Sequence, residues 1–159
     1  MQLNLYMTGD KEIMRKLATL PIKIQRKAVP QSLTQAARPV LNTAKSNAIG
    51  IVGGRFGSLL RKNIVSRVPK RKQQNIAKRV VRIKSMREGA PREFWHTTKD
   101  GKEYYVPAAV EYGHTIPAGT RRVAAMPFMR SAWLTQRHKA YMIFWQEMKR
   151  RVEITVGMS

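Results

Sequence analysis

The sequence predicts an α+β fold: a small antiparallel sheet, a meander with an Asp-Gly hairpin, packed against a long kinked helix and a long C-terminal helix. Two segments, 21–48 and 127–152, repeat apolar residues at helical spacing, and an Asp-Gly pair separates two strand-like runs rich in aromatic residues. No internal repeat divides the chain, and 159 residues suit one domain with a substantial core. We therefore expect a single domain over residues 1–159.

The first third of the chain predicts one strand and two helices. Residues 2–7 alternate apolar and polar side chains, as in a half-buried strand, and residues 10–18 place their apolar positions on one helical face. From Pro21 to Ala48 a second helix is expected, with a break near Pro30, or Pro30 in a first turn, and a kink near Pro39. Its stripe is rich in small residues, which predicts close packing against another element: Val29, Leu33, Ala36, Ala37, Val40, Leu41, Ala44 and Ala48.

The middle of the chain predicts loops and short strands. Four glycines make residues 49–58 a flexible loop, a short helix or turn follows over 59–65, and the basic segment 68–75 is expected to be an exposed loop. Apolar residues at 80, 81, 83 and 86 mark a strand whose basic side chains face outward. Asp100-Gly101 connects 94–98 to 103–106 as a hairpin, Pro107 ends or bulges its second strand, residues 110–113 close the region, and a loop follows over 116–125.

The C-terminal segment predicts the last long helix. Pro127 suits a first helical position, and a broad apolar stripe that begins at Phe128 follows without Gly or Pro. Residues 153–156 have the composition of a last short strand. Trp145 lies beside the main stripe and is interpreted either as a core residue or as an anchor for a neighbouring subunit, because aromatic residues dominate interface hot spots.

The charge of the chain is strongly one-sided. There are 31 Lys+Arg against 9 Asp+Glu, a net charge of +22, and no acidic residue occurs between Glu12 and Glu88. This favours a polyanionic partner, such as nucleic acid, an anionic membrane or an acidic protein surface, over the alternative of a solvated charged face. Because no base-reading motif is present, any DNA contact should ignore sequence. The candidate contacts with DNA or an acidic partner are Arg61, Lys62, Arg67, Lys70, Arg71, Lys72, Arg121 and Arg122.

The sequence offers little for catalysis. Cysteine is absent, and the carboxylates and three histidines are scattered without metal-ligand spacing. The glycine-rich segment 53–57 matches neither a Walker loop nor a dinucleotide fingerprint. We therefore expect no catalytic residue, no cofactor and no metal. The alternative is a nuclease or hydrolase that acts on a polyanion, for which Glu111 and His114 are the residues to test.

No apolar run approaches the length of a membrane span, and the first residues lack the basic and apolar regions of a signal peptide. We therefore expect no membrane contact, and synthesis in a cytoplasm.

Short motifs occur in a defined order over nearly the whole chain. The most specific are Val110-Glu111-Tyr112-Gly113 and the segment 126–132, Met-Pro-Phe-Met-Arg-Ser-Ala. They follow Gly9-Asp10 with its Ile-Met-Arg-Lys-Leu-Ala-Thr-Leu-Pro helix, Ala-Ala-Arg-Pro-Val-Leu at 36–41, and Ser-Leu-Leu-Arg-Lys-Asn-Ile at 58–64. In this order they resemble the tail-completion, or head–tail joining, proteins of long-tailed bacteriophages, the minor tail protein Z-like family. Family members usually have Thr-Gly before the leucine that Leu59 matches, whereas this chain has Gly-Ser, and the 94–105 hairpin is an elaboration.

The resemblance implies a non-enzymatic structural protein of the phage neck that completes the head-proximal end of the tail and enables head–tail joining around the DNA channel. It implies a homo-oligomeric ring, which we expect to be hexameric, with tail terminator, tail tube and head connector proteins as partners. The protein would be made in the host cytoplasm, would reside in the virion and would contact genomic DNA without sequence preference. The alternative is a free-standing, sequence-independent nucleic-acid-binding protein. The residues of the family motifs or of a subunit interface are Glu111, Tyr112, Gly113, Pro127, Phe128 and Trp145.

Overall fold

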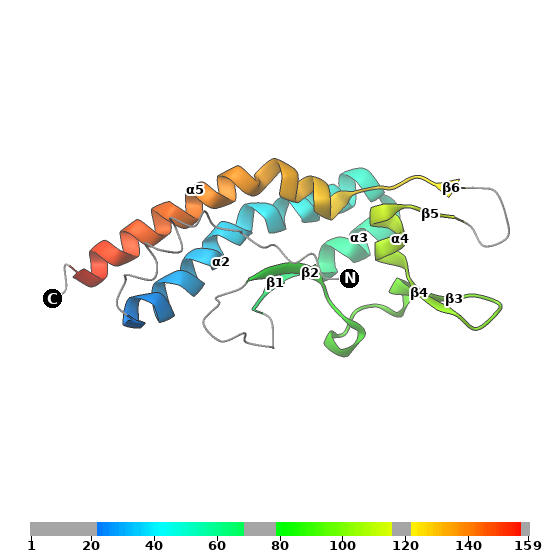
Figure 1. Cartoon of the computed structure of the whole chain (residues 1–159). Coiled ribbons are helices and arrows are strands. Elements are labelled where there is room, and N and C mark those ends of the chain that lie inside the picture. Colours follow the sequence, from blue (N-terminus) through cyan, green and yellow to red (C-terminus); the bar gives the residue numbers. More distant parts are fainter. Residues whose placement is uncertain (1–21, 69–78, 116–121, 157–159) are drawn as a thin grey trace.

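The computed structural model describes residues 22–68, 79–115 and 122–156, in which helices dominate and strands occur in short pairs (Figure 1). This mixed α+β architecture confirms the fold class that the sequence predicts. The strand expected at 2–7 and the helix expected at 10–18 lie outside the described residues. The elements are α2 (Ile22–Asn47), the π-helix η1 (Ala48–Val52), α3 (Gly54–Asn63), β1 (Ile64–Arg67), β2 (Val80–Ile83), the 3-10 helices η2 (Met86–Glu88) and η3 (Arg92–Phe94), β3 (Trp95–Thr97), β4 (Glu103–Tyr105), α4 (Val106–Tyr112), β5 (His114–Thr115), β6 (Arg122–Val123) and α5 (Phe128–Val156).

Helices α2 and α5 lie side by side along most of their length and run antiparallel (Figure 1). At one end the Asn47 side-chain amide donates to the Phe128 carbonyl at 3.1 Å, and near the other end Arg151 donates to the Gln31 side chain. The buried positions of α2 and η1 recur every fourth residue, so that one ridge of small side chains meets α5. The predicted close packing of this stripe is confirmed. The buried ridge comprises Ala28, Ser32, Ala36, Val40, Ala44 and Ala48.

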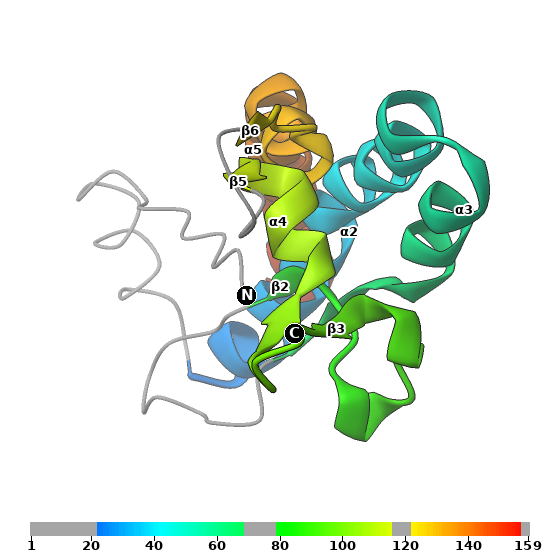
Figure 2. The same cartoon turned by 90° about the vertical axis from the view of Figure 1, so that its right-hand side faces the viewer.

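A second layer packs against α2 and completes the main core, which it shares with the first half of α5. Leu60 of α3, Ile64 of β1 and Val81 of β2 are fully buried there. Phe94 follows from η3 and meets the Phe56 ring edge-on, with ring centroids 5.6 Å apart. Figure 2 shows α4 crossing between this layer and α5, which places α4 where it can tie the two together.

Among the described residues, the strands form three separate two-stranded antiparallel sheets, β1–β2, β3–β4 and β5–β6, instead of the single meander that we expected. The hairpin around Asp100-Gly101 is confirmed, with Trp95 paired to Tyr105. The meander was wrong because the chain turns into helix α4 directly after β4. Pro107 lies in the first turn of α4, where its fixed φ favours a helix and its missing N–H costs no hydrogen bond.

The glycine-rich segment 49–58 is helical, so the flexible loop expected there was wrong. Residues 48–52 form η1, and α3 begins at Gly54 and replaces the shorter helix or turn expected over 59–65. Gly57 of α3 is buried, and a Cβ at this position would lie 2.3 Å from the Ala48 carbonyl oxygen. The glycine therefore permits a close approach of α3 to η1, which a sequence pattern cannot distinguish from loop flexibility.

Two helix boundaries also differ from the expectation. Helix α2 contains both Pro30 and Pro39, so the break expected near Pro30 does not occur. Packing along α5 compensates for the backbone hydrogen bonds that the prolines remove. Helix α5 begins directly after Pro127 and extends to Val156, so the strand expected over 153–156 is the last turn of this helix.

We predict that Gly57→Ala lowers the free energy of unfolding by about 1–3 kcal/mol, because the added methyl group collides with the η1 backbone rather than with a movable side chain. Urea denaturation followed by circular dichroism measures the change. Gly50→Ala is the matched control, because a Cβ at Gly50 meets no atom within 4 Å. Equal stability of the two variants would contradict the close approach.

Candidate functional site

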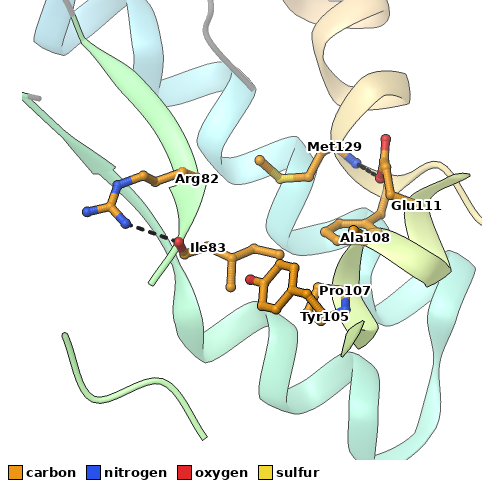
Figure 3. Close-up of a pocket in the computed structure, with 8 residues that line it drawn as sticks. Arg82, Ile83, Tyr105, Pro107, Ala108, Glu111 and Met129 are labelled. Atoms are coloured by element: carbon orange, nitrogen blue, oxygen red, sulfur yellow. Dashed lines mark hydrogen bonds between the residues drawn. The ribbon is translucent and has the colours of Figure 1, made fainter. Parts of the chain in front are cut away.

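The two most specific sequence motifs meet at the junction of α4 and α5, which we call the α4–α5 junction: residues 110–113 together with residues 126–132. Glu111 is only 1% exposed, which is unusual for a carboxylate. Its two oxygens accept hydrogen bonds from the backbone N–H groups of Met129 at 2.9 Å and Arg130 at 2.8 Å. Figure 3 shows the bond from Met129. Glu111 therefore caps α5, where free N–H groups and the helix dipole both stabilise a negative charge.

The residues beside Glu111 close the same junction. The Met126 N–H donates to the Val110 carbonyl at 2.8 Å. Gly113 has a φ of 75°, and a Cβ there would lie 2.7 Å from the Val123 carbonyl oxygen. A side chain at position 113 is thus excluded both by backbone conformation and by the approach of β6.

The exposed side of the junction carries Tyr112 and Arg130. The Tyr112 side chain is about half exposed, and the Arg130 guanidinium lies over its ring, 5.6 Å from the centroid. This cation–π contact links the end of α4 to the first turn of α5. Phe128, directly after Pro127, is fully buried in the main core. The structure therefore brings together five of the six motif residues, all except Trp145.

A cavity of about 20 Å³ adjoins the junction, bounded by Glu111, Tyr105, Phe128 and Met129 (Figure 3). This volume is enough for about one water molecule and far too small for an organic substrate. Burial raises the pKa of Tyr105 to about 12, against a smaller opposing effect of the Arg82 charge. The Tyr105 hydroxyl therefore remains protonated at neutral pH, and the cavity is a packing feature of the junction.

Trp145 lies apart, in the second half of α5. It packs against the edge of a smaller core cluster that includes Phe144 and Met148, and its ring centroid lies 5.5 Å from that of Phe144 and 6.2 Å from that of Tyr141. Its side chain is half-buried. The indole Nε1 is covered and has no hydrogen-bond partner. The packing of Trp145 against the smaller cluster agrees with the core interpretation made from sequence, and the interpretation as an anchor for a neighbouring subunit stays a prediction.

The predicted basic contacts do not form one described cluster. Arg61 and Lys62 are exposed in the last turn of α3, and Arg122 is exposed on β6. Arg67, at the end of β1, lies 3.3 Å from Glu88 and is therefore partly neutralised. Lys70, Arg71, Lys72 and Arg121 lie outside the described residues.

Glu88 organises a basic cluster that the sequence did not reveal. Its carboxylate pairs with both Arg67 and Arg82 and accepts a hydrogen bond from the Ser85 backbone N–H at 3.0 Å. The hydrogen bonds from Arg82 and Ser85 lower the pKa of Glu88 to about 2 from an ordinary value of 4.5. Glu88 thereby joins β1, β2 and η2. The signal for this role was the Ser-x-x-Glu spacing of a capping box at 85–88.

The signal for the Glu111 cap is equally indirect. Residues 124–127, Ala-Ala-Met-Pro, contain no Ser, Thr, Asp or Asn that could cap the helix that follows. A long helix without a local cap indicates that another residue supplies one. The sequence does not say which residue, because Glu111 lies 18 positions before Met129.

Within the described ranges, no three His, Asp or Glu side chains lie close enough together to hold a metal ion. His96 and His138 are exposed and His114 is half-buried, each on a different element. In the same ranges, no helix combines the length and the apolar character that crossing a bilayer requires.

The chain matches no protein-family model, no curated protein and no solved structure.

We predict that Glu111→Gln destabilises the protein by about 1–3 kcal/mol, because the amide keeps one acceptor and loses the charge that stabilises the start of α5. Chemical denaturation measures the effect. Glu103→Gln is the control, because Glu103 is exposed and has no ion-pair partner among the described residues. A loss of stability no larger than that of the control would rule out a strong cap.

A second prediction concerns acid stability. Because the pKa of Glu88 is lower in the folded protein, its contribution is complete above pH 4.5 and is lost as the pH falls towards about 2. Glu88→Gln should therefore reduce stability at neutral pH and flatten the decline in stability between these pH values. Thermal melts across this range provide the measurement, with Glu103→Gln again as control. An unchanged slope would contradict the ion-paired geometry.

Proposed function

We propose that this protein is a structural protein of the phage neck, without catalytic activity, that completes the head-proximal end of the tail and enables head–tail joining around the DNA channel. One observation carries the proposal. The two motifs on which the resemblance chiefly rests are separated in sequence but pack directly on each other through the Glu111 cap. Their joint occurrence thus has a physical reason, which supports treating them as one structural unit rather than as two chance matches.

The proposed role requires a homo-oligomeric ring, expected to be a hexamer, that also meets tail terminator, tail tube and head connector proteins. The shape of the described chain suits such contacts. The α2–α5 pair forms one elongated side, and β3–β4 and β5–β6 extend at the far end (Figure 1). Two-stranded ribbons are marginal alone and expose unpaired edges, so neighbouring subunits would stabilise them.

Basic side chains would face the genome in the proposed ring. Arg61, Lys62 and Arg122 are exposed, and they have no ion-pair partner in the part of the chain that the structure describes. A ring multiplies such weak contacts without requiring tight binding by one subunit. Counterion release would make the DNA contact sequence-independent and sensitive to salt. The exposure of these basic side chains supports the proposed position around a DNA channel.

Deleting the gene from its phage should yield separate DNA-filled heads and finished tails in the lysate, with infectivity restored by the protein supplied in trans. Electron microscopy and plaque counts measure the outcome. Trans-supplied Gly50→Ala protein is the folding-neutral control, because position 50 has open space for a methyl group.

Normal infectious particles after deletion would overturn the proposal. Normal particles combined with tight, salt-sensitive duplex binding by the isolated chain would instead favour the alternative of a free-standing, sequence-independent nucleic-acid-binding protein.

A further inference from the structure

The outer face of α5 is an exposed stripe with the composition of a protein interface. Leu134 is 56% exposed, Tyr141 37% and Met142 46%, although all three are large apolar or aromatic residues. Their spacing of seven and eight places them on one side of the helix, and Trp145 continues the same side. Tyr, Trp, Met and Arg are the residues that interfaces enrich. We call Leu134, Tyr141, Met142 and Trp145 the α5 stripe.

Positive charge accompanies this stripe, and negative charge is absent from it. Arg130 and Arg137 are exposed on α5, and each lies about one turn from Leu134, the first before it and the second after it. Neither arginine has an ion-pair partner among the described residues. The helix has no carboxylate from residue 128 to residue 146. Two such faces would repel each other, so an isologous α5–α5 contact is disfavoured and a partner surface with free carboxylates is required.

Free carboxylates occur at one place in the described chain. Asp100 and Glu103, both on the β3–β4 hairpin, are exposed and have no ion-pair partner among the described residues. The remaining described carboxylates are all engaged within the chain: Glu88, Glu93, Glu111, Glu147 and Glu153. The hairpin is therefore the described surface best able to accept cations from another molecule.

The geometry of the hairpin favours a contact between copies. In both views it extends from the body on the side opposite α5, so it does not lie against the α5 stripe of its own chain (Figures 1 and 2). Glu103 pairs with Thr97 in the ribbon, so the residue directly opposite it is uncharged. Lys99 and Lys102 are exposed on the same hairpin, so its two carboxylates rather than its net charge would make the contact.

We propose that the α5 stripe of one copy binds the β3–β4 hairpin of the next copy, with Arg130 and Arg137 facing Asp100 and Glu103. The apolar side chains of the stripe supply the centre of the contact, and the charge pairs fix its orientation. Because the two surfaces differ, the contact is heterologous, and repetition closes a ring when the rotation between copies allows it. This inference rests on the proposed ring-forming role and names the surfaces that build the ring.

Reversal of charge on each side tests the contact. The full-length wild-type chain should self-associate in light scattering after gel filtration. Asp100→Arg with Glu103→Arg, and separately Arg130→Glu with Arg137→Glu, should each weaken association by at least about tenfold, because every pair then becomes repulsive. A chain that carries all four changes should regain wild-type association, since the pairs are restored with opposite sign. Circular dichroism establishes that each variant is folded.

The matched control is Arg26→Glu with Arg38→Glu, which makes the same change in net charge as the α5 reversal, on exposed positions of α2, and should leave association unchanged. A monomeric wild-type chain, unaffected association in either reversed variant, or failure of the fourfold variant to recover would each overturn the inference. The proposed neck function is tested separately by gene deletion. If deletion gives separate heads and tails but the charge reversals do not change self-association, the proposed neck function stands and only the proposed contact surfaces are rejected.

Discussion

The cap that Glu111 places on α5 is the interaction on which the remaining structure depends. Without it, the first turn of a 29-residue helix would leave backbone N–H groups unsatisfied next to the core. The buried carboxylate is stable there only because two N–H donors and the helix dipole replace its hydration. The same bonds fix α4 against α5, which brings Gly113 against β6 and Phe128 into the core. A single polar contact thus orients the α2–α5 pair relative to the end of the molecule that carries β3–β4 and β5–β6.

The fold accommodates its large positive charge by keeping charge and core apart. Small residues at every fourth position let α2 and α5 approach closely, so the buried ridge of α2 contains no polar side chain apart from Ser32, and the hydrogen bonds of Asn47 and Gln31 lie near the two ends of the contact. Carboxylates are used sparingly, and Glu88 and Glu147 each pair with two arginines. The cations that are left over face solvent, and their mutual repulsion opposes the compact state unless a polyanion or an acidic surface lies nearby. The proposed position around a DNA channel would supply such a partner, and the proposed hairpin contact would supply a second one.

The ribbons have a different physical character from the helices. Each has only two strands, and β3–β4 and β5–β6 extend at one end of the molecule (Figure 1). The β3–β4 ribbon is held to the main core at its base, through Trp95 and Tyr105. An apolar stripe on α5 is left exposed in the same chain. Both features are costly in an isolated monomer and are reasonable in a subunit whose neighbours cover them. The ring proposed for the neck gives both features one explanation.

The sequence by itself determined the elements that depend on the spacing of apolar residues and on turn-forming residues. The α2 stripe, the start of α5 near Pro127 and the Asp-Gly hairpin were predictable, since spacing and turn residues specify them over a few positions. Residues 111–113 and 127–128 were identified from the resemblance alone, which gave no structural role for any of them. Only the tertiary structure decided that Glu111 caps a helix 18 residues further on, that Gly57 permits close packing instead of flexibility, and that the chain continues from the hairpin into a helix over residues 106–112. These outcomes depend on partners distant in sequence, whose approach no local pattern encodes.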